Sequence, residues 1–126
     1  MKYVAKWIVV GLFGVGIVGC STNNQRLYDY GDYSSTLYNL NKNQNEETLA
    51  KHKAELEQII TSSKEHTKKV PPGIYAELGY IYQKGNDKKE AVKLYQLESD
   101  LYPESQYLMA RLIKQVETTD TPVSEK

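Results

Sequence analysis

Cys20 is the only cysteine of the chain, so no disulfide can form within it and its folded part must depend on an apolar core. A short apolar segment runs from Trp7 to the residue before this cysteine, and Lys2 and Lys6 precede it. A basic start, an apolar stretch of about 7–15 residues and a small residue at the cut are typical of a secretory signal peptide. We therefore expect residues 1–19 to be removed, which leaves 107 residues for one small domain.

The end of this segment, Ile17-Val18-Gly19-Cys20, resembles the bacterial lipobox. The resemblance implies that signal peptidase II cuts before Cys20 and that this cysteine carries the lipid. Each buried CH₂ contributes about 0.8 kcal/mol, and a second acyl chain turns marginal binding into stable anchoring. The next residue, Ser21, resembles the pattern that Gram-negative cells release to the outer membrane. We expect a lipid anchor in the outer membrane and a domain that faces the periplasm.

Two alternatives to the lipid anchor are ordinary secretion with a free thiol and an uncleaved membrane anchor. A membrane-spanning helix needs about 20 apolar residues. The stretch from Tyr3 to Gly19 has 17 residues, and Lys6 interrupts it. A retained spanning helix is therefore a weaker interpretation than a lipoprotein.

The charge of the mature chain argues against a nucleic-acid partner. Lys2 and Lys6 are two of the 16 basic residues, and none of the 16 acidic residues precedes Cys20, so the mature net charge is about −2. Nucleic-acid binding needs a basic patch or stripe, and the sequence contains no basic block. Tyrosine is the only aromatic residue type after Cys20, and it packs its ring while still presenting a polar tip.

Apolar residues at helical spacing predict five helices after the signal peptide, and no stretch alternates for long enough to indicate a strand. The first follows Asp32 as its N-cap, and the Asn-rich run 39–45 should break it. The other four are expected to begin near residues 46, 73, 87 and 103. We therefore divide the mature chain into a lipidated tether, a helical domain and a disordered tail, at residues 20–31, 32–118 and 119–126.

Further signals concern the helix faces and ends. The long second helix is expected to bury the face that carries Leu49, Lys53, Leu56 and Ile60, widened by Ile59. Gly85 is expected to end the third helix in the left-handed conformation. Asp87 and Glu90 have the spacing of a capping box at the start of the fourth.

Residues 72–105 resemble one tetratricopeptide repeat, whose period is about 34 residues. The matching positions are Tyr75, Leu78, Gly79, Tyr82, Ala91, Tyr95 and Pro103. Gly79 lets the second helix approach closely, and Ala91 is small where the two helices cross. Glu98 departs from the pattern, so it either loosens the docking of the next segment or turns that edge to solvent. A single repeat cannot bury its own face, and the resemblance therefore implies an all-α, antiparallel array of about five helices.

The mature chain also resembles a family of small Gram-negative lipoproteins with no assigned activity. The shared elements are the lipobox, the tyrosine cluster at 28–33, Leu37-Tyr38, Pro71-Pro72-Gly73, Ala76-Glu77-Leu78-Gly79 and Tyr102-Pro103-Glu104-Ser105. Such proteins are commonly encoded beside a lipoprotein similar to the curli secretion channel and another similar to activators of peptidoglycan synthases. The resemblance implies a role in envelope assembly.

Few residues could carry catalysis or bind a metal. His52 and Glu55 share a helix face, but bundle metal sites use such pairs from facing helices and no second pair exists. We expect His52 on a solvated helix flank and His66 in an exposed linker. No serine lies in a nucleophile-elbow motif, and no Gly-rich loop joins a strand to a helix. We therefore expect no enzymatic activity, metal, cofactor or small-molecule substrate.

Two surfaces are candidates for binding. In tetratricopeptide arrays the first helix of each repeat lines the concave face, which here would present Tyr80, Gln83, Lys84, Tyr107 and Lys114. An ordinary solvated helix face remains the alternative. The second surface is the tyrosine cluster, with Tyr28, Tyr30 and Tyr33. It either packs the N-terminal segment against the first helices or also meets a partner near the membrane.

The anchor, the repeat signature and the absence of catalytic motifs together predict an adaptor. It would hang from the membrane by the lipid on Cys20 and bind envelope proteins in an assembly or secretion complex. The alternative is a structural lipoprotein that contacts peptidoglycan.

Overall fold

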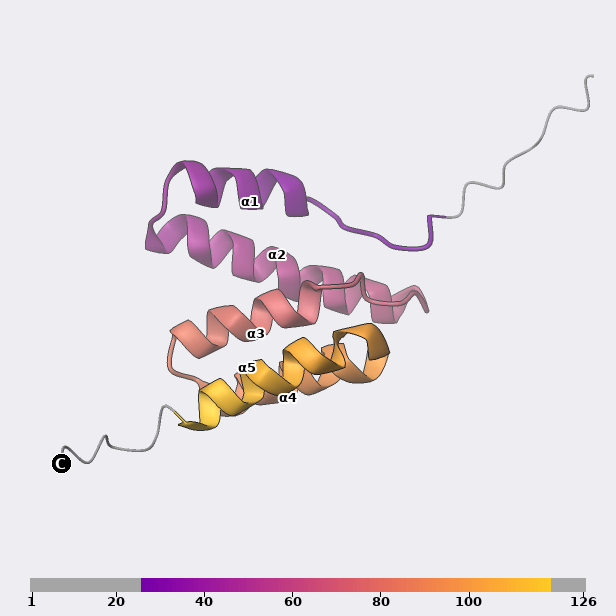
Figure 1. Cartoon of the computed structure of the whole chain (residues 1–126). Helices are drawn as coiled ribbons and strands as arrows, with labels where there is room; N and C mark the ends of the chain where they lie inside the picture. Colours follow the sequence, from indigo (N-terminus) through magenta and orange to yellow (C-terminus); the bar gives the residue numbers. More distant parts are fainter. Residues whose placement is uncertain (1–25, 119–126) are drawn as a thin grey trace, which may run out of the picture.

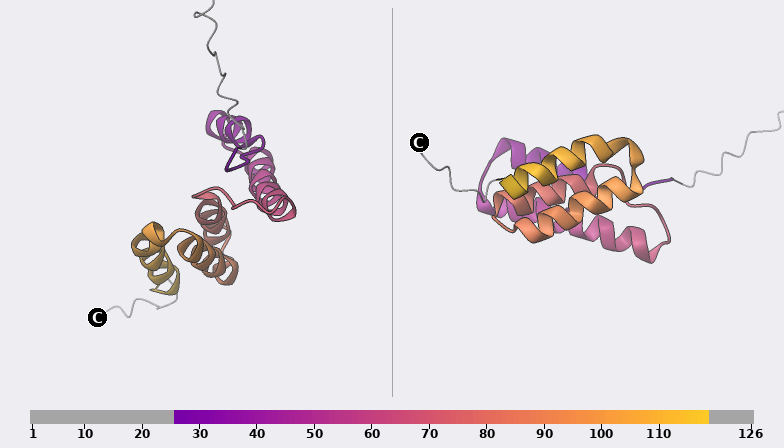
Figure 2. Two further views of the ribbon diagram at one scale, coloured as in Figure 1. Left: turned by 90° about the vertical axis from the view of Figure 1, so that its right-hand side faces the viewer. Right: turned by 60° about the horizontal axis from the view of Figure 1, so that its bottom comes forward.

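Five α-helices follow one another along residues 26–118, which are the residues that the computed structural model describes (Figure 1). They are α1 (Tyr33–Lys42), α2 (Glu46–Glu65), α3 (Ile74–Lys84), α4 (Lys88–Leu101) and α5 (Gln106–Thr118), with a short 3₁₀ helix, η1 (Pro103–Ser105), between α4 and α5. Each helix packs chiefly against its neighbours in the sequence, and Figure 2 shows the resulting curved array. The predicted all-α fold is confirmed for this part of the chain.

Some predictions fall on residues that the structure does not describe. The signal peptide 1–19, the lipidated Cys20, the tether up to residue 25 and the tail 119–126 lie outside the described residues. Within residues 26–118, no helix has the length and the apolar character that crossing a membrane requires.

Of the two predicted N-caps, Asp87 caps with its side chain, whereas Asp32 lies at the start of α1 without a side-chain hydrogen bond; Asn45 and Gly73 were not predicted. Asn45 caps α2, because its Oδ1 accepts a hydrogen bond from the backbone of Thr48 at 2.9 Å and the Thr48 hydroxyl accepts one from the Asn45 backbone at 3.2 Å. Gly73 starts α3 with φ of 89°, a left-handed value that glycine adopts without steric cost. Asp87 caps α4 by accepting from the backbone of Glu90 at 3.1 Å.

Of two predicted helix ends, the first is confirmed and the second is wrong. α1 ends inside the Asn-rich run 39–45, at Lys42, with Asn43 as its C-cap. Gly85 has φ of −78°, and the left-handed residue is its neighbour Asn86, with φ of 64°. Asparagine is one of the few residues other than glycine that visits this region routinely.

The core has two parts that share α3 and α4. The first lies among α2, α3 and α4, and its buried residues are Leu56, Ile59, Val70, Ile74, Tyr75, Leu78 and Leu94. The second joins α4 to α5 and contains Ala91, Tyr95, Met109 and Val116. At the crossing of α3 and α4, a Cβ on Gly79 would lie 2.9 Å from Cε1 of Tyr95. The close approach predicted at Gly79 is therefore confirmed.

The buried face of α2 differs from the predicted one. His52 and Ser63 are completely buried on this helix, whereas Leu49 is 40% exposed. The prediction is confirmed at Leu56 and Ile59 and wrong at Leu49, because His52 finds polar partners on neighbouring helices and is buried in its place. The buried face is therefore rotated toward the histidine.

Glu98 is also buried, with only 3% of its surface exposed. Its Oε1 accepts a hydrogen bond from the backbone N–H of Gly73 at 2.7 Å, at the start of α3. Buried carboxylates are costly unless they find donors, and the open N-terminus of a helix supplies one. The alternative in which Glu98 turns this edge to solvent is wrong: the carboxylate instead ties α4 to the first turn of α3.

Candidate protein-binding surfaces

A groove lies between the first half of α2 and the second half of α3, and we call it the α2–α3 groove. It encloses about 710 Å³ and is lined by Glu46, Leu49, Ala50, Lys53, Tyr80, Ile81, Tyr82, Lys84, Gly85 and Asp87. Tyr80 is 50% exposed there. Lys53 places its ammonium group 3.9 Å from the centre of the Tyr82 ring, within the range of cation–π attraction.

The structure places two of the predicted concave-face residues, Tyr80 and Lys84, in the α2–α3 groove. Gln83 has a different role, because its side-chain oxygen accepts a hydrogen bond from the Tyr95 hydroxyl at 2.7 Å. This bond pairs the hydroxyl of a completely buried tyrosine. Gln83 therefore supports the α3–α4 crossing, and it does not line the α2–α3 groove.

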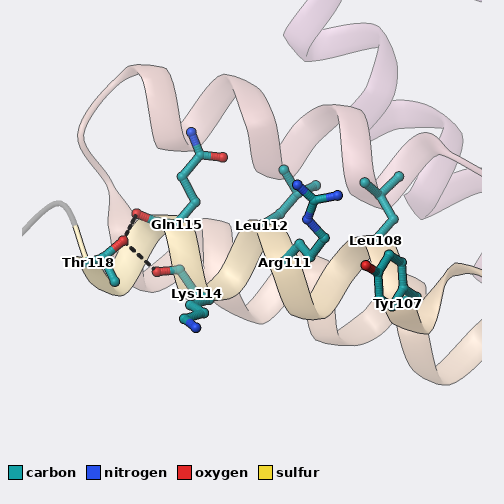
Figure 3. Close-up of a pocket in the computed structure, with 7 residues that line it drawn as sticks. All are labelled: Tyr107, Leu108, Arg111, Leu112, Lys114, Gln115 and Thr118. Carbon is teal, nitrogen blue, oxygen red and sulfur yellow. Dashed lines mark hydrogen bonds between the residues drawn. The ribbon is translucent and has the colours of Figure 1, made fainter.

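The other two predicted residues of this face lie in a separate groove on α5. This α5 groove has a volume of about 760 Å³, and the described residues that line it all come from α5: Tyr107, Leu108, Arg111, Leu112, Lys114, Gln115 and Thr118. Figure 3 shows Leu108, Leu112 and Gln115 projecting from the same side of this helix. The structure thus divides the predicted concave face into two grooves.

The rings of the tyrosine cluster, Tyr28, Tyr30 and Tyr33, contact one another in sequence order and end against His52 of α2. We call this arrangement the tyrosine row. The ring centres of Tyr28 and Tyr30 are 6.4 Å apart, those of Tyr30 and Tyr33 are 6.0 Å apart, and Tyr33 lies 5.5 Å from His52. Burial, followed by the neighbouring Tyr28 hydroxyl, raises the pKa of Tyr102 at the end of α4. The row therefore packs the N-terminal segment onto the helices, while Tyr30 remains 42% exposed.

A polar cluster that the sequence did not reveal joins α1, α2 and α3. Glu77 on α3 accepts a hydrogen bond from the Tyr33 hydroxyl at 2.8 Å, and its other oxygen lies 2.9 Å from Nε2 of His52. The Thr36 hydroxyl lies 2.8 Å from Nδ1 of the same ring. The predicted solvated position of His52 is therefore wrong. Glu55, which the sequence places on the same helix face, accepts a hydrogen bond from the backbone of Asp32 at 2.7 Å.

The electrostatics of this polar cluster favour a protonated tyrosine. Burial, followed by the hydrogen bond to Glu77, raises the pKa of Tyr33 to about 12, because ionisation would place two negative charges side by side. His66 is exposed, as predicted, and its ring nitrogen lies 2.8 Å from the Ser62 carbonyl oxygen at the end of α2. Among residues 26–118, no group of three or more His, Cys, Asp or Glu side chains could hold a metal ion.

Residues 27–112 match a family model described as a domain of unknown function, DUF4810. The chain belongs to this family. The DUF4810 match begins just before the tyrosine row and ends within α5, so it includes the polar cluster and the whole α2–α3 groove. No curated protein and no solved structure matches the chain.

Proposed function

We propose that this protein is a lipid-anchored, non-enzymatic adaptor of the outer membrane that faces the periplasm and binds partner proteins in an envelope assembly or secretion complex. The observation that carries the binding role is the α2–α3 groove. The lipobox resemblance at Cys20 supports the anchor. The resemblance to small lipoproteins that are commonly encoded beside envelope assembly and secretion proteins supports the kind of complex.

The chemistry of the α2–α3 groove suits a protein segment. Leu49 and Tyr80 expose 40% and 50% of their surfaces, on two helices that pack against each other. Lys53 and Lys84 lie over tyrosine rings, so their aliphatic stems add apolar area while their charges stay at the edge. Hydrophobic grooves of this kind accept the apolar face of an amphipathic helix.

The polar cluster supports a structural role and not catalysis. Thr36, His52 and Glu77 have the order of hydroxyl, imidazole and carboxylate that hydrolases use. A general base must, however, reach a proton of the substrate. His52 is 0% exposed and both of its ring nitrogens already lie within hydrogen-bond distance of partners. We therefore assign the cluster to holding α1 against α2 and α3.

The packing of α3 on α4 supports the proposed relation to tetratricopeptide arrays. Gly79, Ala91 and Tyr95 meet at the crossing, where any side chain on Gly79 would collide with the Tyr95 ring. Arrays of helical pairs present extended surfaces to protein partners. This geometry fits an adaptor whose helices stay in place when a partner binds.

Replacing Cys20 with alanine tests the anchor. We expect the Cys20→Ala variant to leave the outer-membrane fraction, because the proposed lipid attachment requires the thiol of Cys20. Membrane fractionation of cells that produce either form gives the readout. A variant that stays in the outer membrane like the wild type contradicts the proposed anchor.

Affinity purification of the full-length, lipidated protein tests the adaptor role. The wild type and an exposed control variant on α1, Tyr38→Ala, should recover the same envelope proteins. The groove variant Leu49→Glu with Tyr80→Ala should lose them, since it places a charge on the apolar surface and removes the exposed ring. Equal recovery by all three proteins contradicts the role of the groove. Sedimentation with purified peptidoglycan sacculi, unaffected by the groove variant, would support the structural alternative.

A further inference from the structure

The last helix of the described chain is covered on one side only. Met109 and Val116 are 2% exposed and pack with Ala91 and Tyr95 of α4. Tyr107 and Leu108, in contrast, are 77% and 56% exposed. The earlier helix α3 packs against both α2 and α4. Within residues 26–118, α5 therefore has a helix on one side and an open groove on the other.

The described residues that line the α5 groove carry charge of one sign. Arg111 and Lys114 line it, and none of the lining residues within 26–118 is acidic. Among residues 26–118 neither cation forms an ion pair with an acidic side chain. Arg111 instead lies 6.0 Å from the centre of the Tyr107 ring. The groove thus offers leucine and tyrosine surface together with two cations that a carboxylate could reach.

We propose that the α5 groove binds an acidic amphipathic α-helix of a partner protein. The apolar face of this helix packs on Leu108, Leu112 and Tyr107, and carboxylates three or four residues apart face Arg111 and Lys114. α5 has 13 residues and is about 20 Å long, so the bound helix has about four turns along its whole length. It covers α5 as α4 does on the opposite side. This surface is separate from the α2–α3 groove and adds a second partner site to the proposed function.

A second copy of this chain fits the α5 groove less well than an acidic helix. A two-fold axis would bring Arg111 and Lys114 of the two copies into the same small interface, and like charges that face each other are unfavourable. Residues 119–126 of this chain are an alternative occupant, because they include Asp120 and Glu125. The test must therefore distinguish this segment from a partner helix.

The test uses the full chain in detergent and three fluorescent helical peptides that share one leucine face. Their solvent-facing positions carry glutamate, glutamine or lysine. Fluorescence anisotropy should show that the wild type binds the glutamate peptide at least about tenfold more tightly than the lysine peptide. Raising the ionic strength should reduce this preference, since exposed charge pairs are screened.

A charge reversal makes the assignment specific to the α5 groove. The variant Arg111→Glu with Lys114→Glu should reverse the preference and bind the lysine peptide more tightly. The matched control is Lys68→Glu with Lys69→Glu, which reverses two exposed cations between α2 and α3, outside both grooves, and should leave the preference unchanged. Circular dichroism melting of all variants shows that they are folded, as expected for substitutions on the surface.

Several results would overturn this inference. They are equal binding of the three peptides by the wild type, an unchanged preference after the charge reversal in α5, or a loss of preference in the control variant. A stable dimer that the variant Leu108→Glu dissociates would assign the groove to a second copy. Tighter peptide binding after deletion of residues 119–126 would assign it to that segment. None of these results depends on partner recovery through the α2–α3 groove, so the two proposals fail separately.

Discussion

The first and last helices of the array, α1 and α5, are attached to it by different interactions. No residue of α1 is fully buried, and hydrogen bonds from Tyr33 and Thr36 fix it to the polar cluster on α2 and α3. α5 instead buries Met109 and Val116 in an apolar contact with α4. A hydrogen bond contributes a net of about 0.5–1.5 kcal/mol, whereas a fully buried large apolar side chain contributes about 1.5–3 kcal/mol. We therefore expect α1 to open before α5 does.

The largest loss in the free energy of unfolding is expected from a variant in the apolar contact between α4 and α5, which we call the apolar attachment. Tyr95→Ala removes a ring that is 0% exposed and that contacts both Gly79 on α3 and the α5 side of the core. We expect the free energy of unfolding to fall by about 4 kcal/mol, the usual cost of deleting a buried aromatic ring. Urea unfolding measures it. The control Tyr95→Phe loses only the hydrogen bond to Gln83 and should cost about 1 kcal/mol. Equal costs for the two variants would show that the ring itself does not hold this region together.

A smaller loss in the free energy of unfolding is expected from a variant in the hydrogen bonds between α1 and the polar cluster, which we call the polar attachment. Glu77→Ala leaves the Tyr33 hydroxyl and His52 without their shared acceptor, so we expect a loss of about 2 kcal/mol. Hydrogen exchange should show lower protection in α1, with α4 and α5 unchanged. Glu104→Ala, at an exposed carboxylate of η1, is the control and should leave α1 protected. Uniform loss of protection in Glu77→Ala would contradict the separate attachment of α1.

Alkaline pH should weaken the polar attachment through Tyr33. The pKa of Tyr33 is raised from 10.0 to about 12, so the folded chain holds this proton more tightly than the unfolded chain does. The resulting stabilisation is complete below pH 10 and is lost as the pH rises toward 12. The wild type should therefore be more stable than Tyr33→Phe at pH 7, and this difference should shrink between pH 10 and pH 12.

Urea unfolding at several pH values measures this difference. Tyr38→Phe, at a 64% exposed position of the same helix, is the control and should follow the wild type at every pH. A stability difference between the wild type and Tyr33→Phe that stays constant up to pH 12 would rule out Tyr33 as the titrating group.

The smallest effects are expected at the helix caps. Asn45→Ala and Asp87→Ala each remove one side-chain acceptor at the start of a helix, and each should cost about 1 kcal/mol. Asn45 caps the helix that supports α1, while Asp87 caps α4. Hydrogen exchange should therefore show faster exchange near α1 only for Asn45→Ala. The same exchange pattern in both variants would mean that the two parts of the array unfold together.

The sequence predicted what local chemistry controls. Pro71 to Gly73 and Pro103 mark helix boundaries, and the crossing of α3 on α4 follows from the small Gly79. The sequence did not predict that His52 is buried, because the partner of this side chain, Glu77, lies 25 residues away on another helix. Polar residues that are buried through such distant partners do not contribute to an apolar periodicity. For this reason the expected buried face of α2 was correct at Leu56 and Ile59 but included the exposed Leu49 and left out His52.

The same limit applies to Glu98 and to the candidate grooves. The acceptor role of Glu98 becomes visible only when α4 lies beside the first turn of α3 and Gly73. The resemblance to tetratricopeptide arrays placed Tyr80 and Tyr107 at the surface correctly. It could not show that they belong to two different grooves, because that depends on which side of α5 the preceding helix α4 covers.

The position of the N-terminal segment along α2 has a mechanical consequence. Residues 29–31 lie beside Glu55 and Ile59, from the middle of α2 onward, whereas the α2–α3 groove is built on its first turns, from Glu46 to Lys53. The two sites occupy successive stretches of one continuous helix of 20 residues, so α2 holds them at a fixed separation. A molecule in the groove would sit at a fixed height above the point where the chain enters the domain. Inserting or deleting one helical turn in α2 would change that height by about 5.4 Å, the pitch of an α-helix.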